Sequence, residues 1–284
     1  MTVNDCVTDA ADVLIRAGFA PGEARRDASV LARHLLGWSL AMWAAGTRDP
    51  APADLQQRLH AAVRRRATHE PVAYITGVRE FYGRDFHVTP AVLIPRPETE
   101  ALAELAIEAT SGPHSSIVVD VGTGSGCVAV TIALECPGER VIATDVSPAA
   151  LDVARENAKQ LGARVEFVQS SLLPPTPQVV DVIVSNPPYV PRADEAVLPP
   201  DVREFEPALA LYAEDDGLAV IRALIWAARA RLRPLGWLLM EIGEGQSAAV
   251  DSLLRSSGLR LERFVPDLQG IPRVVVARQP RSSA

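Results

Sequence analysis

Residues 117–145 read IVVDVGTGSGCVAVTIALECPGERVIATD, and this stretch decides the fold. Its apolar run at 117–121 predicts a buried strand, and the glycines that follow predict a sharp turn into a helix over 126–135. A second apolar segment, 140–145, ends in Asp145. A strand, a glycine turn, a helix and a second strand form a βαβ unit. We therefore expect a parallel sheet that binds its ligand at the carboxyl ends of the strands.

The same alternation continues on both sides of that stretch. Further helices are expected over residues 97–110, 148–161, 216–232 and 246–257, and further strands over residues 165–170, 179–186, 237–242, 260–265 and 273–278. The last two strands follow each other directly, which predicts an antiparallel hairpin at one edge. The fold class is thus α/β, with a doubly wound, mostly parallel, seven-stranded sheet and a long irregular stretch after residue 186.

Two smaller parts precede the sheet. Residues 1–78 carry the apolar spacing of helices without any strand pattern, so we expect a small helical bundle. Residues 79–96 place Phe81 and Phe86 on either side of a glycine, which predicts a β-hairpin connector. The remaining residues, 97–284, are expected to form the α/β domain.

The composition excludes several classes of protein. With 48% apolar and 22% charged residues the chain can bury a core. Its net charge of −7 offers no argument for a basic face, so direct nucleic-acid binding is not expected. Three cysteines and five histidines without ligand spacing argue against a disulfide framework and against a metal site. Neither a membrane-spanning apolar run nor a signal peptide is evident, so a cytoplasmic protein is expected.

The glycine loop and the acid that follows it predict a nucleoside-containing ligand. Asp145 lies nineteen residues after Gly126, a spacing at which a carboxylate can accept hydrogen bonds from a ribose. The loop reads G-T-G-S-G, which is not the glycine spacing of a dinucleotide site, and no Walker lysine follows. These features fit S-adenosylmethionine best. The expected cofactor contacts are Gly122, Thr123, Gly124, Ser125, Gly126 and Asp145.

Residues 181–189, DVIVSNPPY, place hydrogen-bond acceptors at the end of another buried strand. Asn186 follows the strand, Pro187 and Pro188 stiffen the turn, and Tyr189 adds a flat face. An sp² amino nitrogen is a poor nucleophile because its lone pair is delocalised. The Asn186 side-chain oxygen and the Pro187 carbonyl can hold its two N–H groups and orient it toward an electrophile, without a strong general base.

The same acceptors suit several amino groups, so these residues alone leave the substrate open. One hypothesis is a protein glutamine methyltransferase, and another is a methyltransferase for adenine N6 or cytosine N4 in DNA or RNA. The nucleic-acid enzyme needs a basic recognition region and room for a flipped base, whereas the extra domain here is small, helical and upstream. A third hypothesis is a non-catalytic cofactor-binding protein, against which the intact N-P-P-Y motif argues.

Longer motifs separate these hypotheses by resemblance. Residues 71–77 (PVAYITG), 79–83 (REFYG), 94–100 (IPRPETE), 202–207 (VREFEP) and 215–217 (DDG) resemble the HemK/PrmC family of peptide chain release factor N5-glutamine methyltransferases. These are class I S-adenosylmethionine-dependent methyltransferases. The resemblance implies methylation of the side-chain amide nitrogen of the glutamine in the Gly-Gly-Gln motif of class I release factors. It also implies that the helical domain helps to grip the factor.

The resemblance further implies roles for individual residues. The glycine loop would surround the methionine portion of the cofactor, Asp145 would bind its ribose, and Asn186 would touch both cofactor and substrate. Catalysis would fall to Asn186, Pro187 and Tyr189, and the glutamine slot would be formed by Asn186, Pro187, Pro188 and Tyr189.

Three other features carry expectations of their own. Ser171 replaces an acid that the family often places near the adenine, so any contact to the adenine amino group is expected to come from elsewhere, and Leu172 is expected to offer only an apolar face to the cofactor. Glu98 and Glu100 favour the start of a helix, with a role beside the cofactor as the alternative. The basic run at residues 64–66 is expected to be a solvated face, with contact to an acidic or RNA-rich partner as the alternative.

Overall fold

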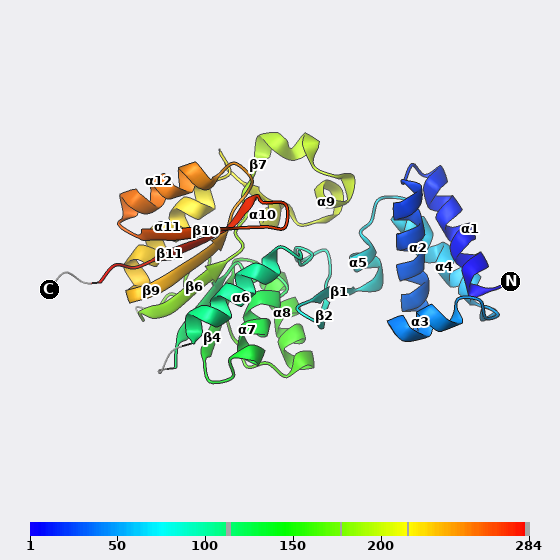
Figure 1. Cartoon of the computed structure of the whole chain (residues 1–284), viewed down its shortest axis with the longest axis horizontal. Coiled ribbons are helices and arrows are strands. Elements are labelled where there is room, and N and C mark those ends of the chain that lie inside the picture. Colours follow the sequence, from blue (N-terminus) through cyan, green and yellow to red (C-terminus); the bar gives the residue numbers. More distant parts are fainter. Residues whose placement is uncertain (112–114, 177, 215, 282–284) are drawn as a thin grey trace. The chain divides into compact units, whose positions relative to one another are not determined.

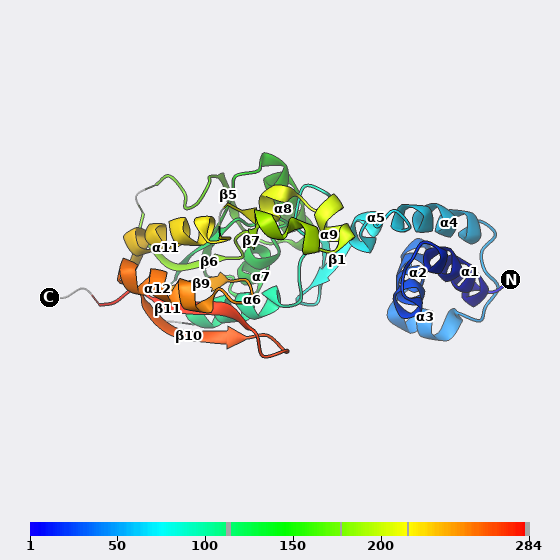
Figure 2. The same cartoon turned by 90° about the horizontal axis from the view of Figure 1, so that it is seen from above.

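The computed structural model describes residues 1–111, 115–176, 178–214 and 216–281 (Figures 1 and 2). His114, one of the five histidines, and Asp215, of the DDG motif, lie outside the described residues. The chain divides into two compact units, which are Met1–Val78 with Pro199–Phe205, and Arg79–Leu198 with Glu206–Ala284.

The first unit is helical, as the sequence predicts. It contains α1 (Val3–Arg16), α2 (Pro21–Leu36), α3 (Leu40–Gly46), α4 (Leu55–Arg66), α5 (Val72–Thr76) and α9 (Pro200–Phe205). Thr2 and Asp5 form a reciprocal capping box at the start of α1, and Gly37 ends α2 in the left-handed conformation. The sequence did not predict α3, because its seven residues are too few to show a helical period. Trp38 and Trp43 contact each other edge to face, with their ring centroids 6.3 Å apart.

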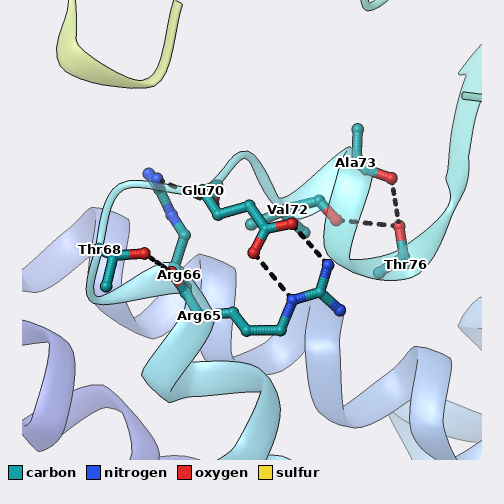
Figure 3. Close-up of polar contacts among 7 residues, drawn as sticks. All are labelled: Arg65, Arg66, Thr68, Glu70, Val72, Ala73 and Thr76. Carbon is teal, nitrogen blue, oxygen red and sulfur yellow. Dashed lines mark hydrogen bonds and ion pairs between the residues drawn. The ribbon is translucent and has the colours of Figure 1, made fainter. Parts of the chain in front are cut away.

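The basic run at the end of α4 is not a uniform solvated face. Arg66 is buried, and its Nε donates to Asp27 of α2 at 2.7 Å. Arg65 lies at the surface, where its guanidinium contacts both carboxylate oxygens of Glu70, at 2.8 and 2.5 Å (Figure 3). The expectation of a solvated face is therefore wrong for Arg66. The partner of Arg66 lies on another helix, and the local sequence pattern of α4 cannot reveal such a partner.

The expected hairpin is present and packs into the second unit. It consists of β1 (Val78–Phe81) and β2 (Arg84–His87). Phe81 and Phe86 meet edge to face with centroids 6.0 Å apart, and both are buried beside Leu102. Glu100 accepts a hydrogen bond from the backbone N–H of Tyr82 at 3.0 Å, which fixes the turn of the hairpin to the start of the next helix.

The second unit is built on the predicted seven-stranded sheet. Its strands are β3 (Ile117–Val121), β4 (Arg140–Asp145), β5 (Glu166–Gln169), β6 (Val180–Ser185), β9 (Leu232–Glu241), β10 (Arg260–Pro266) and β11 (Pro272–Arg278), and their order is β10-β11-β9-β6-β3-β4-β5. Strand β11 is antiparallel to both of its neighbours, and the other pairings are parallel. The mostly parallel sheet and the antiparallel hairpin at its edge are thereby confirmed.

Helices cover both faces of the sheet (Figures 1 and 2). They are α6 (Thr99–Thr110), α7 (Cys127–Glu135), α8 (Pro148–Leu161), α11 (Ala219–Arg231) and α12 (Ser247–Ser257). Successive strand residues point to opposite faces. On β6, Val182 and Val184 join a core cluster with residues of α6, α7 and α8, whereas Ile183 joins a cluster with residues of α11 and α12.

Residues 187–214 contain more regular structure than the sequence predicts. They include β7 (Val190–Pro191), a 3₁₀-helix at Arg192–Val197, α9, α10 (Ala208–Leu211) and β8 (Tyr212–Ala213). Each of these elements has six residues or fewer, so none of them shows a period that sequence reasoning could detect.

In the described part of the chain, no helix combines the length and the apolar character needed to cross a membrane.

Candidate active site

A cavity of about 240 Å³ lies where β3, β4 and β6 end, and we call it the glycine-loop cavity. Its wall includes Arg96, Thr99, Asp120, Gly122, Thr123, Gly124, Ser125, Asp145, Ser170, Ser171, Asn186, Pro187 and Pro188. These are the carboxyl ends of parallel strands, where doubly wound sheets bind their ligands. The structure therefore brings most of the residues that the sequence singles out to one place.

The glycine loop follows the cavity wall because its backbone is tied to β4. The N–H groups of Gly122 and Thr123 both donate to the carbonyl of Thr144, at 2.8 and 2.9 Å. Gly122 and Gly124 have φ values of 71° and 55°, and a Cβ at either position would meet open space. Left-handed backbone favours glycine, so the two residues keep a bare surface of backbone beside the cavity.

Gly126 contributes to helix packing and not to the cavity wall. Its φ is 81°, and a Cβ there would lie 3.0 Å from the Cβ of Ala154 on α8. It does not belong to the described residues that line the glycine-loop cavity. The third glycine of the loop thus allows the start of α7 to pack closely against α8.

Two acids flank the loop. Asp145 accepts from the N–H of Gly124 and from the N–H of Ser147, both at 2.9 Å, and these two bonds hold its carboxylate at the cavity wall. Asp120 is buried and accepts from the hydroxyl of Thr123 at 2.6 Å. Burial raises the pKa of Asp120 to about 7, although the bond from Thr123 opposes this shift.

Asn186 belongs to a chain of polar contacts that runs away from the cavity. Its Nδ2 donates to the hydroxyl of Thr99 at 3.1 Å, and that hydroxyl donates to Glu241 Oε2 at 2.8 Å. The hydroxyl of Tyr189 donates to Glu241 Oε1 at 3.2 Å. Thr99 and Glu241 are both buried. Burial raises the pKa of Glu241 and that of Tyr189.

An ion pair between Arg96 and buried Glu206 holds another part of the wall. Arg96, which lines the cavity, donates to Glu206 Oε1 at 2.5 Å, and the backbone N–H of Ile94 donates to Glu206 Oε2 at 3.2 Å. Glu206 joins the segment that precedes α6 to the segment that follows α9. Arg96 and Pro207, the residue after Glu206, both line the cavity, so its wall combines parts of the chain that are about 110 residues apart.

Some predicted site residues lie behind the wall. Leu172 and Tyr189 are absent from the described residues that line the cavity, and both pack against the core cluster of α11 and α12. The hydroxyl of Tyr189 is engaged with Glu241, whereas the sequence suggested a role for the ring face alone. Neither Glu98 nor Glu100 lines the cavity among the described residues.

Sequence reasoning missed Thr99 and Glu241. Thr99 stands between two glutamates at the start of α6, so the acidic neighbours draw attention instead. Glu241 interrupts the apolar run WLLMEIG at residues 237–243. A charged residue at the carboxyl end of a buried strand was the signal that could have found it. Of the described residues, no group of three or more histidines, cysteines or acids is placed to hold a metal ion.

Two protein families match the chain, one in each part. Residues 5–77 match the PrmC N-terminal domain, and residues 98–198 match the Methyltransferase small domain. The Release factor glutamine methyltransferase of Cereibacter sphaeroides is 44% identical over 282 residues, which is 99% of each chain. The protein of the same name from Deinococcus radiodurans is 40% identical over 98% of this chain and 99% of its own length.

Solved structures of other methyltransferases share the fold. A methyltransferase from Pyrococcus furiosus aligns with a TM-score of 0.52 and 16% identity, over 70% of this chain and 91% of its own. The hMettl16 catalytic domain, solved in complex with MAT2A 3′UTR hairpin 1, aligns with a TM-score of 0.56 and 20% identity, over 78% of this chain and 82% of its own. At these identities the likeness concerns the fold alone, which is that of class I methyltransferases.

Proposed function

The chain belongs to the family of release factor glutamine methyltransferases, and we propose that it methylates the side-chain amide nitrogen (N5) of the glutamine in the Gly-Gly-Gln motif of class I peptide chain release factors. The proposed methyl donor is S-adenosylmethionine. The release factor is the proposed partner, and the reaction needs neither a nucleic acid nor a membrane. Because release factors act in translation, we place the reaction in the cytoplasm.

One observation carries the proposal. Two groups of residues line the same cavity: the first is the glycine loop with Asp145, and the second is Asn186 with Pro187 and Pro188. The first group has the features of a nucleoside-binding site, and the second has acceptors for an amino group. A methyl donor and an amide acceptor can therefore meet there.

The residues of the loop fit S-adenosylmethionine. Gly122 and Gly124 leave open space where side chains would otherwise intrude. Asp145 is held by two backbone N–H groups, so its oxygens keep lone pairs for the hydroxyls of a ribose. Ser170 and Ser171 also line the cavity and would lie nearest the base. When bound, the cofactor supplies an electrophilic methyl group on a positively charged sulfur.

Asn186 and Pro187 then act on the acceptor. A glutamine side chain carries two N–H groups, which the Asn186 Oδ1 and the Pro187 carbonyl would accept. Holding both hydrogens orients the amide nitrogen toward the methyl group of the cofactor. The two acceptors also favour the positive charge that develops on the nitrogen during transfer. The methylated nitrogen is strongly acidic at that moment, so its extra proton can leave to water. For this reason the site requires no strong base.

We assign the first unit to recognition of the release factor. Its residues 5–77 match the PrmC N-terminal domain, so the relatives carry this part together with the catalytic part. Of the domains expected from the sequence, residues 1–78 would thus contribute to binding the factor, and residues 79–284 would contribute the hairpin and the catalytic sheet.

A labelling experiment with three acceptors tests the proposal. The protein is incubated with methyl-labelled S-adenosylmethionine and, in separate reactions, a class I release factor, duplex DNA and RNA. We expect label on the release factor alone, and no label on a factor whose Gly-Gly-Gln glutamine is replaced by glutamate. Label on DNA or RNA, with none on the factor, would instead identify an amino-methylating nucleic-acid enzyme.

A further inference from the structure

We infer that Glu241, acting through Thr99, fixes the side-chain amide of Asn186 so that its oxygen faces the glycine-loop cavity. Thr99 and Glu241 are thereby positioning residues for the acceptor nitrogen. This inference deepens the proposed function and rests on it for its meaning in catalysis, but the orientation itself can be measured without any acceptor.

The fold brings the three residues together from three elements. Asn186 follows β6 and Glu241 ends β9, and these parallel strands are neighbours, with Ser185 paired to Met240. Thr99 begins α6 and lies between the two ends, with its hydroxyl 3.1 Å from Asn186 Nδ2 and 2.8 Å from Glu241 Oε2. Thr99 is only 3% exposed and Glu241 only 2%, so water is largely excluded from the contact.

Counting hydrogens fixes the direction of each bond. An ionised carboxylate only accepts, and a threonine hydroxyl has a single hydrogen to give. Each oxygen of Glu241 has a hydroxyl donor, Thr99 on one and Tyr189 on the other, so the carboxylate can stay ionised with both oxygens accepting. The hydrogen of Thr99 is therefore committed to Glu241, so toward Asn186 the hydroxyl can only accept.

The amide of Asn186 then has one favourable orientation. With Nδ2 toward Thr99, the contact is a hydrogen bond, and Oδ1 is left to face the opposite way. If the amide were turned over, Oδ1 would face the Thr99 oxygen with no hydrogen between them, and a buried pair of acceptors is unfavourable. The turned amide would also present a donor, which cannot hold the N–H of a glutamine acceptor.

Nuclear magnetic resonance can test the contact directly, because the chain has three asparagines, Asn4, Asn157 and Asn186. Labelling asparagine with ¹⁵N gives three side-chain NH₂ pairs, and Asn186→Ala assigns the relevant one. We expect Thr99→Val, which keeps the shape and removes the acceptor, to speed hydrogen exchange of the Asn186 NH₂ by about 10-fold or more. Thr99→Ser, which keeps a hydroxyl, should restore the slow exchange.

Asn157 serves as the internal control for folding. Its Nδ2 donates to the carbonyls of His87 and Ser125, at 2.9 and 2.8 Å, independently of Thr99. Its exchange should stay slow in every variant that folds. If the Asn186 NH₂ exchanges equally slowly in Thr99→Val while Asn157 is also unchanged, the proposed orientation is wrong.

Kinetics then test whether Glu241 acts through Thr99. With a release factor as acceptor, we expect Thr99→Val to lower kcat by about 10- to 100-fold with little change in the KM for cofactor, and Thr99→Ser to recover most of it. Glu241→Gln lets the Thr99 hydrogen point either way, so it should also lower kcat. In the Thr99→Val background the same change should alter kcat less than about twofold, because the link is already broken.

If Glu241→Gln lowers kcat by the same factor with and without Thr99→Val, the two residues act independently, and the proposed role of Glu241 is refuted. The proposed function fails separately, if the wild-type protein leaves the release factor unlabelled. In that case the exchange measurements still decide the orientation of Asn186, because they need no acceptor.

Discussion

The backbone N–H of Gly124 donates to a carboxylate oxygen of Asp145 over 2.9 Å, which joins the middle of the glycine loop to the end of β4. The other oxygen of Asp145 accepts from Ser147 at the start of α8. One side chain therefore both shapes the loop and lines the cavity. This dual role explains why a loop of small residues can keep a defined form beside an open space.

The first prediction concerns cofactor affinity. Asp145→Ala should weaken binding of S-adenosylmethionine at least about 100-fold, because charge-assisted hydrogen bonds contribute ~1.5–3 kcal/mol each and the loop also loses its tie. Isothermal titration calorimetry measures the affinity. Asp152→Ala is the matched control, since Asp152 is an exposed residue of α8 that pairs only with Arg155 in the described structure. Equal affinities for both variants would remove Asp145 from the cofactor site.

The second prediction concerns packing at Gly126. Gly126→Ala should lower the free energy of unfolding by ~2–4 kcal/mol, because it combines left-handed backbone with a Cβ placed 3.0 Å from that of Ala154. Adding Ala154→Gly should recover the packing part of the loss. Gly138→Ala is the control, since a Cβ there meets nothing within 4 Å. Denaturant unfolding of the three variants provides the comparison, and equal stability of Gly126→Ala and Gly138→Ala would contradict the packing role.

Most of the sheet could be predicted from the sequence because its signals are local. Alternating apolar runs and helical spacing lie within single segments, and the β3 bounds, Ile117–Val121, match the expected ones. The short elements between residues 187 and 214 could not be predicted, because their form depends on partners distant in the chain. Glu206, for example, is held by Ile94 and Arg96.

For the candidate site too, the parts with a local sequence signal could be predicted and the contacts between distant segments could not. Gly122 and Asn186 each follow an apolar strand and Asp145 ends one, so their place at the carboxyl edge can be inferred without knowing the strand order. The contact of Asn186 with Glu241 through Thr99 requires β9 to lie beside β6, and sequence alone does not fix that order. The packing role that separates Gly126 from Gly122 and Gly124 could not be predicted either, because it depends on Ala154, which approaches Gly126 only in the folded chain.

The third prediction concerns the chemical step. Asn186→Ala removes an acceptor at the cavity wall and leaves a substrate N–H unpaired. It should lower turnover on a release factor by ~10²–10³-fold, while S-adenosylmethionine still binds measurably. Single-turnover methyl transfer separates the two effects. Asp152→Ala, at an exposed position of α8 in the second unit, is the control and should turn over normally. Turnover of Asn186→Ala near the wild-type rate would exclude Asn186 from catalysis.

The fourth prediction contrasts two ion pairs of the helical unit. Asp27→Ala should destabilise this unit by ~3 kcal/mol, because it removes a close partner of buried Arg66, which keeps only the half-exposed Glu23 as an ionic partner in the described structure. Arg65→Ala should cost less than about 1 kcal/mol, since the Arg65 side chain is 51% exposed. Hydrogen exchange of the amides in α2 and α4 reports on this unit separately. Equal protection in both variants would contradict the difference in burial.

The last prediction concerns pH. Asp120 has its pKa raised by burial from 3.8 to about 7, so between these values the folded chain holds a proton that the unfolded chain releases. Proton uptake by the folded form means that this group stabilises it most at low pH. Its contribution to the free energy of unfolding should fall as the pH rises from about 4 to about 7, by up to ~1.4 kcal/mol per pH unit, and stay constant above that range.

Asp120→Asn tests this dependence because it keeps the shape of the side chain and cannot titrate. The variant should show a flatter stability profile between pH 4 and pH 7 than the wild type, measured by urea unfolding at several pH values. Asp152→Asn, at an exposed position, should leave the wild-type slope unchanged. If Asp120→Asn follows the wild-type profile throughout, Asp120 titrates at its ordinary value, and Thr123 then donates to a carboxylate that is ionised over the whole range.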